Sequence, residues 1–399
     1  MNSIYDFAFS AQGYNHIRVK KVCQDSSGHY SDDRMSIAVV ADGHGSDDYP
    51  RTDKGSRYAV EAAIGSIKEF VDTVVDCNIG IEENPEAYLE QLAKSILSKW
   101  YAAVYADVAE HPFTQTEMDN VSDRYQKRYL SGHKSEKAYG TTLIAACQTE
   151  SFWFGIQIGD GKCVTISTDG AIEQPIPWDE NCQSNITTSI CDSDAINEFR
   201  YAFKTKCPAA TLMGTDGIDD SYADEEELYV LYRSILSIFA EHGRQVGENE
   251  VSGFLPGLSR RGSGDDVSIA GIVSAELSIG FVALLKAQCE YKNALAQKEK
   301  AEHDATLAAE RYDYVCDALQ KAKRTFENCN QKEAEARIAV EQAKEAQISA
   351  GERYVAAQEA LKQAVQLYSH EDDSAGDGPQ RSDAVFISTE NMKDNEVLQ

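Results

Sequence analysis

Short runs of β-branched and other apolar residues, separated by polar or glycine-bearing segments, recur along most of the chain. They predict strands at 36–41, 140–146, 151–158, 162–168, 209–215 and 267–273. Apolar residues at helical spacing predict helices at 55–76, 85–109 and 225–242. We interpret 8–21 as extended and the polar segment 26–34 as a hairpin loop. Strand pairs alternating with helical blocks indicate an α+β domain over residues 1–275, an antiparallel β-sandwich flanked by helices.

The pattern changes to a seven-residue repeat over residues 276–368. Large side chains such as Tyr312, Leu319 and Phe326 occupy the first core position of the repeat, and alanine occupies nearly every second core position. A repeat sustained this long predicts a helical coiled coil. It leaves two forms open, a long rod of about 130 Å or an antiparallel hairpin folding back near 327–332. Residues 369–399 are acidic and carry Gly, Ser and Pro, which predicts a disordered tail.

Charge and composition argue against several classes of binding partner and against a membrane location. The formal net charge of −28 argues against nucleic acid or an anionic membrane surface as a partner. The chain contains no apolar run long enough to span a membrane, and its N-terminus lacks the pattern of a signal peptide. Ten cysteines occur without any Cys-x-x-Cys spacing, which favours free thiols over a disulfide framework or zinc site. We therefore expect a cytoplasmic protein.

Aspartates recur where predicted strands end or turn. They are Asp25, Asp42, Asp160, Asp216, Asp220 and Asp265. An Asp beside a Gly is commonly only a turn residue, but here Asp42, Asp216 and Asp265 each adjoin a hydrophobic strand. If the strand ends converge, the gathered like charges require cations. Oxygen ligands without a Cys/His cluster favour Mg²⁺ or Mn²⁺ over zinc.

Six short motifs, in this order, resemble the type 2C metal-dependent protein serine/threonine phosphatases. They are Gln24-Asp25, Val40-Ala41-Asp42-Gly43-His44-Gly45, Gly140-Thr141-Thr142, Gly159-Asp160-Gly161, Thr215-Asp216-Gly217-Ile218-Asp219-Asp220 and Gly264-Asp265-Asp266-Val267-Ser268. The opening Gly13-Tyr14-Asn15-His16 is similar to a bacterial branch of the family. The resemblance covers residues 1–275 and implies a β-sandwich with a two-metal site at one edge.

The resemblance also implies roles for individual residues. Asp42 would bridge two Mn²⁺ or Mg²⁺ ions, Gly43 would offer its carbonyl, and Asp216 and Asp265 would complete the set. Asp25 would act at the metals directly or through water, and Asp160 and Asp220 match the positions that hold a third metal. His44 matches the general acid that protonates the leaving alkoxide. The family's phosphate-binding arginine falls at Lys20, so Lys20 or the nearby Arg18 would bind phosphate. Asp266 stands where many members have Asn.

These residues imply hydrolysis of phosphoserine and phosphothreonine in proteins by a hydroxide that bridges the two ions. The alternative is a catalytically silent scaffold that binds phosphoproteins and assembles through the coiled coil. The acids favour activity, since a silent domain would be expected to have lost one or more. The resemblance further implies a phosphoprotein substrate and a cognate serine/threonine kinase as counterpart. The coiled coil is expected either to form a homodimer or to dock a partner.

Overall fold

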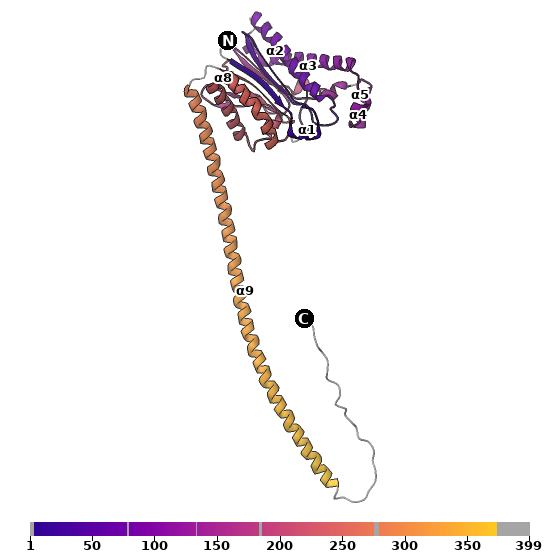
Figure 1. Cartoon of the computed structure of the whole chain (residues 1–399), viewed down its shortest axis with the longest axis vertical. Coiled ribbons are helices and arrows are strands. Elements are labelled where there is room, and N and C mark those ends of the chain that lie inside the picture. Colours follow the sequence, from indigo (N-terminus) through magenta and orange to yellow (C-terminus); the bar gives the residue numbers. More distant parts are fainter. Residues whose placement is uncertain (1–3, 78–79, 133, 183–185, 275–278, 373–399) are drawn as a thin grey trace. The chain divides into compact units, whose positions relative to one another are not determined.

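The computed structural model describes residues 4–77, 80–132, 134–182, 186–274 and 279–372 (Figure 1). Its contacts divide the chain into two units, Met1–Lys300 and Ala301–Gln399. The boundary predicted at 275–276 lies outside the described residues, and so does the predicted tail from residue 373 onward.

Two antiparallel five-stranded sheets form the centre of the first unit. One sheet has the order β1-β10-β9-β6-β7 and the other β2-β3-β4-β5-β8. The strands are β1 (Ile4–Ala11), β2 (Ser26–Ser31), β3 (Met35–Ala41), β4 (Leu143–Thr149), β5 (Trp153–Ile158), β6 (Lys162–Ile166), β7 (Ile172–Glu173), β8 (Arg200–Lys204), β9 (Ala210–Gly214) and β10 (Val267–Ser274). The predicted α+β sandwich is confirmed.

Helices flank the two sheets (Figure 1). The α-helices are α1 (Tyr14–Val19), α2 (Thr52–Asp76), α3 (Pro85–Glu110), α4 (Gln115–Met118), α5 (Asp123–Leu130), α6 (Ala195–Glu198), α7 (Asp216–Asp219), α8 (Glu225–Arg261) and α9 (Ile279–Asp372). Two 3₁₀ turns, η1 (Ile81–Glu83) and η2 (Ser135–Tyr139), lie among them.

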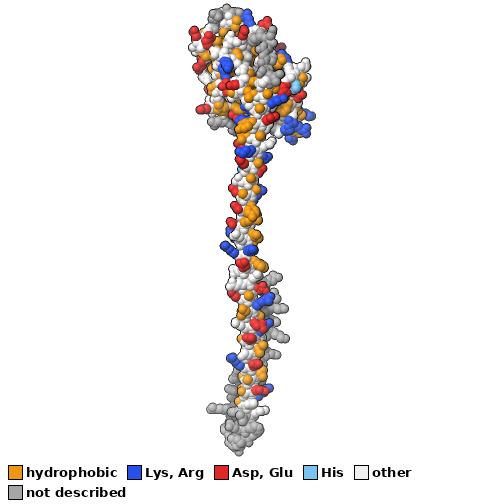
Figure 2. All heavy atoms as spheres, turned by 90° about the vertical axis from the view of Figure 1, so that its left-hand side faces the viewer, with side chains coloured by type: hydrophobic (Ala, Val, Ile, Leu, Met, Phe, Trp, Pro, Cys, Tyr) orange, Lys and Arg blue, Asp and Glu red, His pale blue; other side chains and the backbone are white. Residues whose placement is uncertain are grey.

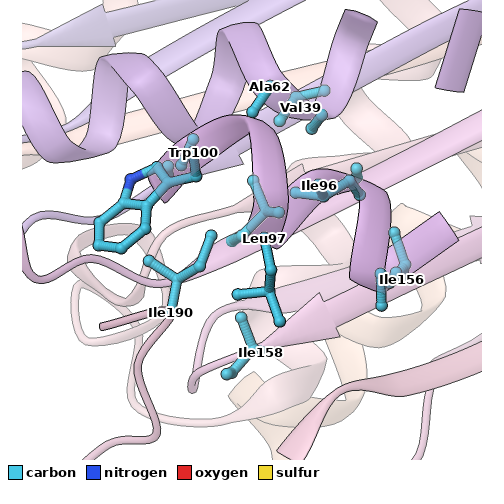
Figure 3. Close-up of a cluster of buried hydrophobic side chains, with 14 of the residues drawn as sticks. Val39, Ala62, Ile96, Leu97, Trp100, Ile156, Ile158 and Ile190 are labelled. Carbon is cyan, nitrogen blue, oxygen red and sulfur yellow. The ribbon is translucent and has the colours of Figure 1, made fainter. Parts of the chain in front are cut away.

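The largest core lies between the β2–β8 sheet and helices α2 and α3. The predicted stripe on α3 is buried there, and Figure 3 shows Ile96, Leu97 and Trp100 facing side chains of the sheet such as Val39 and Ile156. Trp100 is fully buried, and its indole Nε1 donates a hydrogen bond to the carbonyl of Gly55 at 3.0 Å. This bond joins α3 to α2 and satisfies the one polar atom of the side chain.

Two further cores complete the sandwich. Val40, Ile144, Met213 and Ile272 belong to a cluster contributed by both sheets. The outer face of the other sheet packs on α8, and the beginning of α9 joins this third cluster through Leu285, which is fully buried. The first turns of α9 therefore belong to the folded sandwich unit.

Three local predictions were wrong. The segment predicted as a hairpin loop contains strand β2, which pairs with β3. β2 is an edge strand of half-exposed polar residues, so it lacks the apolar signal of a central strand. Tyr14–Val19 is helix α1 rather than extended chain, and it ends where Lys20 adopts left-handed backbone angles. α8 continues past residue 242 because the backbone of Gly243, with a φ of +75°, permits a kink between two helical parts.

The helix of the seven-residue repeat is continuous. α9 runs for 94 residues without a break, including 327–332, where the sequence left a fold-back open. The structure therefore shows the straight form and not the hairpin. Within the described part of the chain, no helix combines the length and the apolar composition needed to cross a bilayer.

Candidate metal centre

Four of the six predicted strand-end acids, Asp42, Asp160, Asp216 and Asp265, line one pocket of about 110 Å³. It is lined by Gln24, Asp42, Gly43, His44, Gly45, Thr142, Asp160, Thr187, Asp216, Asp265 and Asp266. Asp42 follows β3 directly, Asp160 lies just past β5, Asp216 begins α7 after β9, and Asp265 precedes β10. Strands of both sheets thus deliver carboxylates to the same edge of the sandwich.

Backbone hydrogen bonds hold Asp42 in place. Its N–H donates to Thr142 Oγ1 at 3.0 Å, and its carbonyl accepts from the Thr142 N–H at 2.8 Å and the Thr141 hydroxyl at 2.7 Å. Gly43 packs so tightly that a Cβ atom would lie 2.5 Å from the carbonyl oxygen of Gln24. The Gly140-Thr141-Thr142 motif therefore fixes the backbone of Asp42, and a side chain at position 43 would clash with Gln24 and Thr52.

The carboxylates raise one another's affinity for protons. Burial raises the pKa of Asp42 well above its usual value, and the nearby charges of Asp216 and Asp25 raise it further. Burial also raises the pKa of Asp160, to which the charge of Asp216 adds. Burial and the charge of Asp216 also raise the pKa of Asp265, although a hydrogen bond from the backbone N–H of Asp266 acts to lower it. Such a cluster holds its negative charge at neutral pH only beside cations.

Asp25 lies behind the pocket lining. Its carboxylate is buried and accepts a hydrogen bond from the Thr215 hydroxyl at 2.8 Å. Burial raises its pKa strongly, and the charges of Asp266 and Asp216 raise it further. Since Asp216 influences both Asp25 and Asp42, the predicted metal-site acids form one electrostatic group.

His44 lines the pocket but is held by its neighbours. Its Nε2 lies 2.7 Å from Ser189 Oγ, and the ring meets Tyr49 edge-on at 4.8 Å. Burial and the positive charge of Lys137 together lower its pKa to about 4, against the opposing charges of Asp192 and Asp216. Ser189 was not found from the sequence, because it lies in an irregular polar segment without a periodic signal.

Asp266 ties the N-terminal segment to the centre. It is 3% exposed and accepts hydrogen bonds from the backbone N–H groups of Gly13 at 2.5 Å and Gln24 at 2.6 Å. His16 Nδ1 lies 2.9 Å from its Oδ2. One ligand atom each from His16, Asp265 and Asp266 lies within 4.8 Å of the other two. Asp266 thus organises the segment that carries Asp25, a role that its sequence position alone did not reveal.

The predicted phosphate-binding side chains lie elsewhere. Arg18 and Lys20 are exposed, on α1 and at its C-terminal cap, and neither lines the acidic pocket. Lys21 does not line this pocket either, but it is half-buried, and its Nζ donates to the carbonyl of Gly45, a pocket residue, at 2.5 Å. The left-handed backbone of Lys20 lies directly before Lys21, and the sequence does not show that turn.

A larger cavity of about 390 Å³ adjoins the pocket. Asp160 and Asp216 line both spaces, while Asp220 and Asp219 line the larger one. The turn bearing Asp160 depends on Gly159, whose φ is +102°, and on Gln157 Nε2, which donates to the Gly159 carbonyl at 3.1 Å. The structure therefore brings together the two aspartates predicted for a third metal.

The donor set suits hard divalent cations. Carboxylate and backbone oxygens dominate the lining, and no cysteine belongs to it. Mg²⁺ and Mn²⁺ prefer such ligands, whereas zinc favours nitrogen and sulfur.

Comparison with known proteins agrees with this picture. The family model described as protein phosphatase 2C matches residues 12–255. No curated protein matches the chain. Solved structures with a similar fold include the Mycobacterium tuberculosis serine/threonine phosphatase PstP/Ppp, at 17% identity and a TM-score of 0.42 over 68% of this chain and 99% of that one. Another is PppA of Pseudomonas aeruginosa, at 16% identity and a TM-score of 0.43 over 68% and 98%. The catalytic domain of PstP in complex with two manganese ions matches at 18% identity and a TM-score of 0.42 over 69% and 99%.

Proposed function

Since this chain belongs to the protein phosphatase 2C family, a family of protein serine/threonine phosphatases, we propose that it hydrolyses phosphoserine and phosphothreonine in proteins with bound Mn²⁺ or Mg²⁺. The observation that carries the proposal is the convergence of five aspartates from four strand ends on one pocket. A silent scaffold would have no need to keep so costly a cluster of like charges.

In the proposed centre Asp42, Gly43, Asp216 and Asp265, which all line the pocket, would hold the two cations. Asp25 supports the set from behind through Thr215. Bound Mn²⁺ or Mg²⁺ would supply Lewis acidity that offsets the phosphate charge and makes water nucleophilic near neutral pH. Asp160 and Asp220 would hold a third, more weakly bound cation beside the larger cavity.

Two side chains of the chain would act on the phosphoester itself. His44 would donate a proton to the leaving alkoxide once the negative charge of a bound phosphate raises its pKa and favours the imidazolium form. Ser189 Oγ would orient its ring through Nε2. Lys21 would attract the phosphate, because its ammonium group lies at the pocket rim beside Gly45 whereas Lys20 is exposed. A lysine binds phosphate as a point charge rather than in a bidentate fork.

The substrate would be a phosphoprotein, and the natural counterpart a serine/threonine kinase that adds the group removed here. The family membership supports this class of substrate. The kinase follows from the chemistry, because a phosphatase needs a phosphorylating enzyme to supply its substrate.

The test is hydrolysis of p-nitrophenyl phosphate with Mn²⁺, Mg²⁺ or EDTA by wild type, Asp42→Asn and Asp216→Asn. Asn keeps the shape but removes the charge that holds a cation, so we expect turnover to fall at least as far as the roughly 10–100-fold seen for supporting residues of metal sites. Asp313→Asn on the exposed surface of α9 is the matched control and should retain wild-type activity. A folded wild type that binds Mn²⁺ yet turns nothing over would instead support the scaffold.

A further inference from the structure

The helix beyond Lys300 leaves its seven-residue seam open. In residues 301–364, which the structure describes in full, no side chain is buried. The large residues of the first core position are among the exposed ones, with Tyr312 70%, Leu319 63% and Phe326 67% accessible. Figure 2 shows hydrophobic side chains spaced along this helix among charged ones. Residues of this kind normally lie in a helix–helix interface.

We propose that a second copy of this chain covers the seam, as an antiparallel coiled coil. Reversing the partner places its second core position opposite the first core position of this chain. With the pairing centred between Phe326 and Cys329, Tyr312 faces Ala343 of the second copy and Leu319 faces Ala336. Six of the eight distinct layers between residues 301 and 354 then join a larger and a smaller side chain, whereas Val315 meets Val340 and Ala305 meets Ala350. The two helices can therefore keep one close separation along most of the seam.

A parallel pairing in register packs poorly. It would place Tyr312 against Tyr312 of the second copy, and then Ala322 against Ala322, so bulky and empty layers would alternate. Interiors tolerate neither overpacking nor voids without loss of stability.

Charges favour the same direction. Parallel pairing brings Glu333 against Glu333 of the second copy inside the seam and Lys332 against Arg337 at its flank, which are like-charge contacts. Antiparallel pairing places Glu333 opposite Ala322, and it brings Asp304 near Arg353 of the second copy. The symmetry repeats this opposite-charge contact at both ends.

The occupant is a second copy because the seam is complementary to itself. Residues 301–354 supply both the large side chains and the alanines that receive them, in reverse order about one centre. A different partner would have no reason to find this symmetry. The paired segment would extend for about 80 Å, with the two sandwich units departing from opposite ends.

The first experiment measures the mass of the full-length chain by light scattering over a dilution series. We expect twice the chain mass of 44.0 kDa. Leu319→Glu places a charge in the seam and should return the protein to the mass of one chain. Ile338→Glu changes an apolar residue of similar exposure (60%) that lies outside the seam, and it should leave the dimer intact. A single-chain mass for the wild type would overturn the proposal and leave the seam to a different protein.

The second experiment fixes the direction. In a Cys316→Ala/Cys329→Ala background, Tyr312→Cys in one tagged copy and Ala343→Cys in another should cross-link on oxidation when the two are mixed, because the antiparallel layer places these positions opposite one another. Tyr312→Cys alone should not cross-link above the background protein. Cross-linking by Tyr312→Cys alone would show parallel chains and overturn the antiparallel assignment.

Discussion

The sandwich unit and the helix beyond Lys300 use their apolar residues in opposite ways. In the first, patterned side chains such as those of α3 find their partners within the same chain and are buried. In the second, an equally regular pattern stays exposed over 301–364. The contrast shows that a periodic pattern of hydrophobic residues predicts a packing interface, but not whether the packing partner belongs to the same chain or to another one. The sandwich is therefore stabilised by contacts within one chain, whereas we expect the helix to be stabilised by association.

The largest expected effect that sharpens this comparison comes from removing one aromatic side chain from each region. Trp100→Ala should lower the free energy of unfolding of the sandwich by about 3–5 kcal/mol, because it leaves a cavity and breaks the hydrogen bond to Gly55. Phe326→Ala, at an exposed site, should leave the same transition unchanged. Urea unfolding followed by the fluorescence of buried Trp153 measures both. Equal destabilisation by the two would remove the distinction between the regions.

The next largest effect concerns the ion pairs that Arg51 forms inside the sandwich unit, one of them with Asp107. Burial opposes ionisation of Asp107, but hydrogen bonds from Tyr139 and Lys54 and the charge of Arg51 lower its pKa to about 2. A carboxyl whose pKa is lower in the folded state stabilises the protein above its unfolded value of 3.8, and this stability is lost as the pH falls toward 2. Nearly two pKa units correspond to roughly 2 kcal/mol.

Asp107→Asn should therefore cost about 2 kcal/mol of unfolding free energy at pH 7, and the difference from wild type should shrink as the pH falls from about 4 to 2. Glu333→Gln removes an exposed ion pair with Arg337 on α9 and should show no comparable pH dependence in the sandwich transition. Unfolding free energies from urea titrations at several pH values test this. A difference that stays constant with pH would contradict the assignment of the lowered pKa.

The smallest effect distinguishes two neighbouring lysines inside the sandwich unit. Lys21→Met should raise the KM for a phosphoester by about tenfold, or roughly 1.4 kcal/mol, with a smaller change in kcat, because it removes a charge that attracts the substrate. Lys20→Met removes the same charge from an exposed site and should leave KM unchanged. Steady-state kinetics at low ionic strength compares them. The opposite order of effects would return the phosphate-binding role to Lys20.

The sequence predicted the site best where a potential metal ligand lies at the end of a strand. Asp42, Asp160, Asp216 and Asp265 each follow or precede a strand, and both sheets present those ends at one edge. Their convergence follows from the alternation of apolar strands and glycine-bearing turns, which short local patterns encode.

Features set by tertiary contact were missed. Strand β2 is polar because it lies at a sheet edge, and only its pairing with β3 makes it a strand. Lys21 contacts the pocket residue Gly45, and Ser189 reaches His44 across a long separation in sequence. The continuity of α9 through 327–332 was left open because the same heptads suit a rod and a hairpin.

The wall shared by the two acidic cavities has one further consequence. Asp160 and Asp216 border both spaces, so a charge that enters one changes the potential in the other. Linkage makes this influence reciprocal. If a cation bound in the larger cavity changes the affinity of the smaller one by some factor, a cation bound in the smaller cavity changes the affinity of the larger one by the same factor. Binding in the two cavities is therefore coupled, so that occupancy of the weaker site, in the larger cavity, would adjust the affinity of the stronger site.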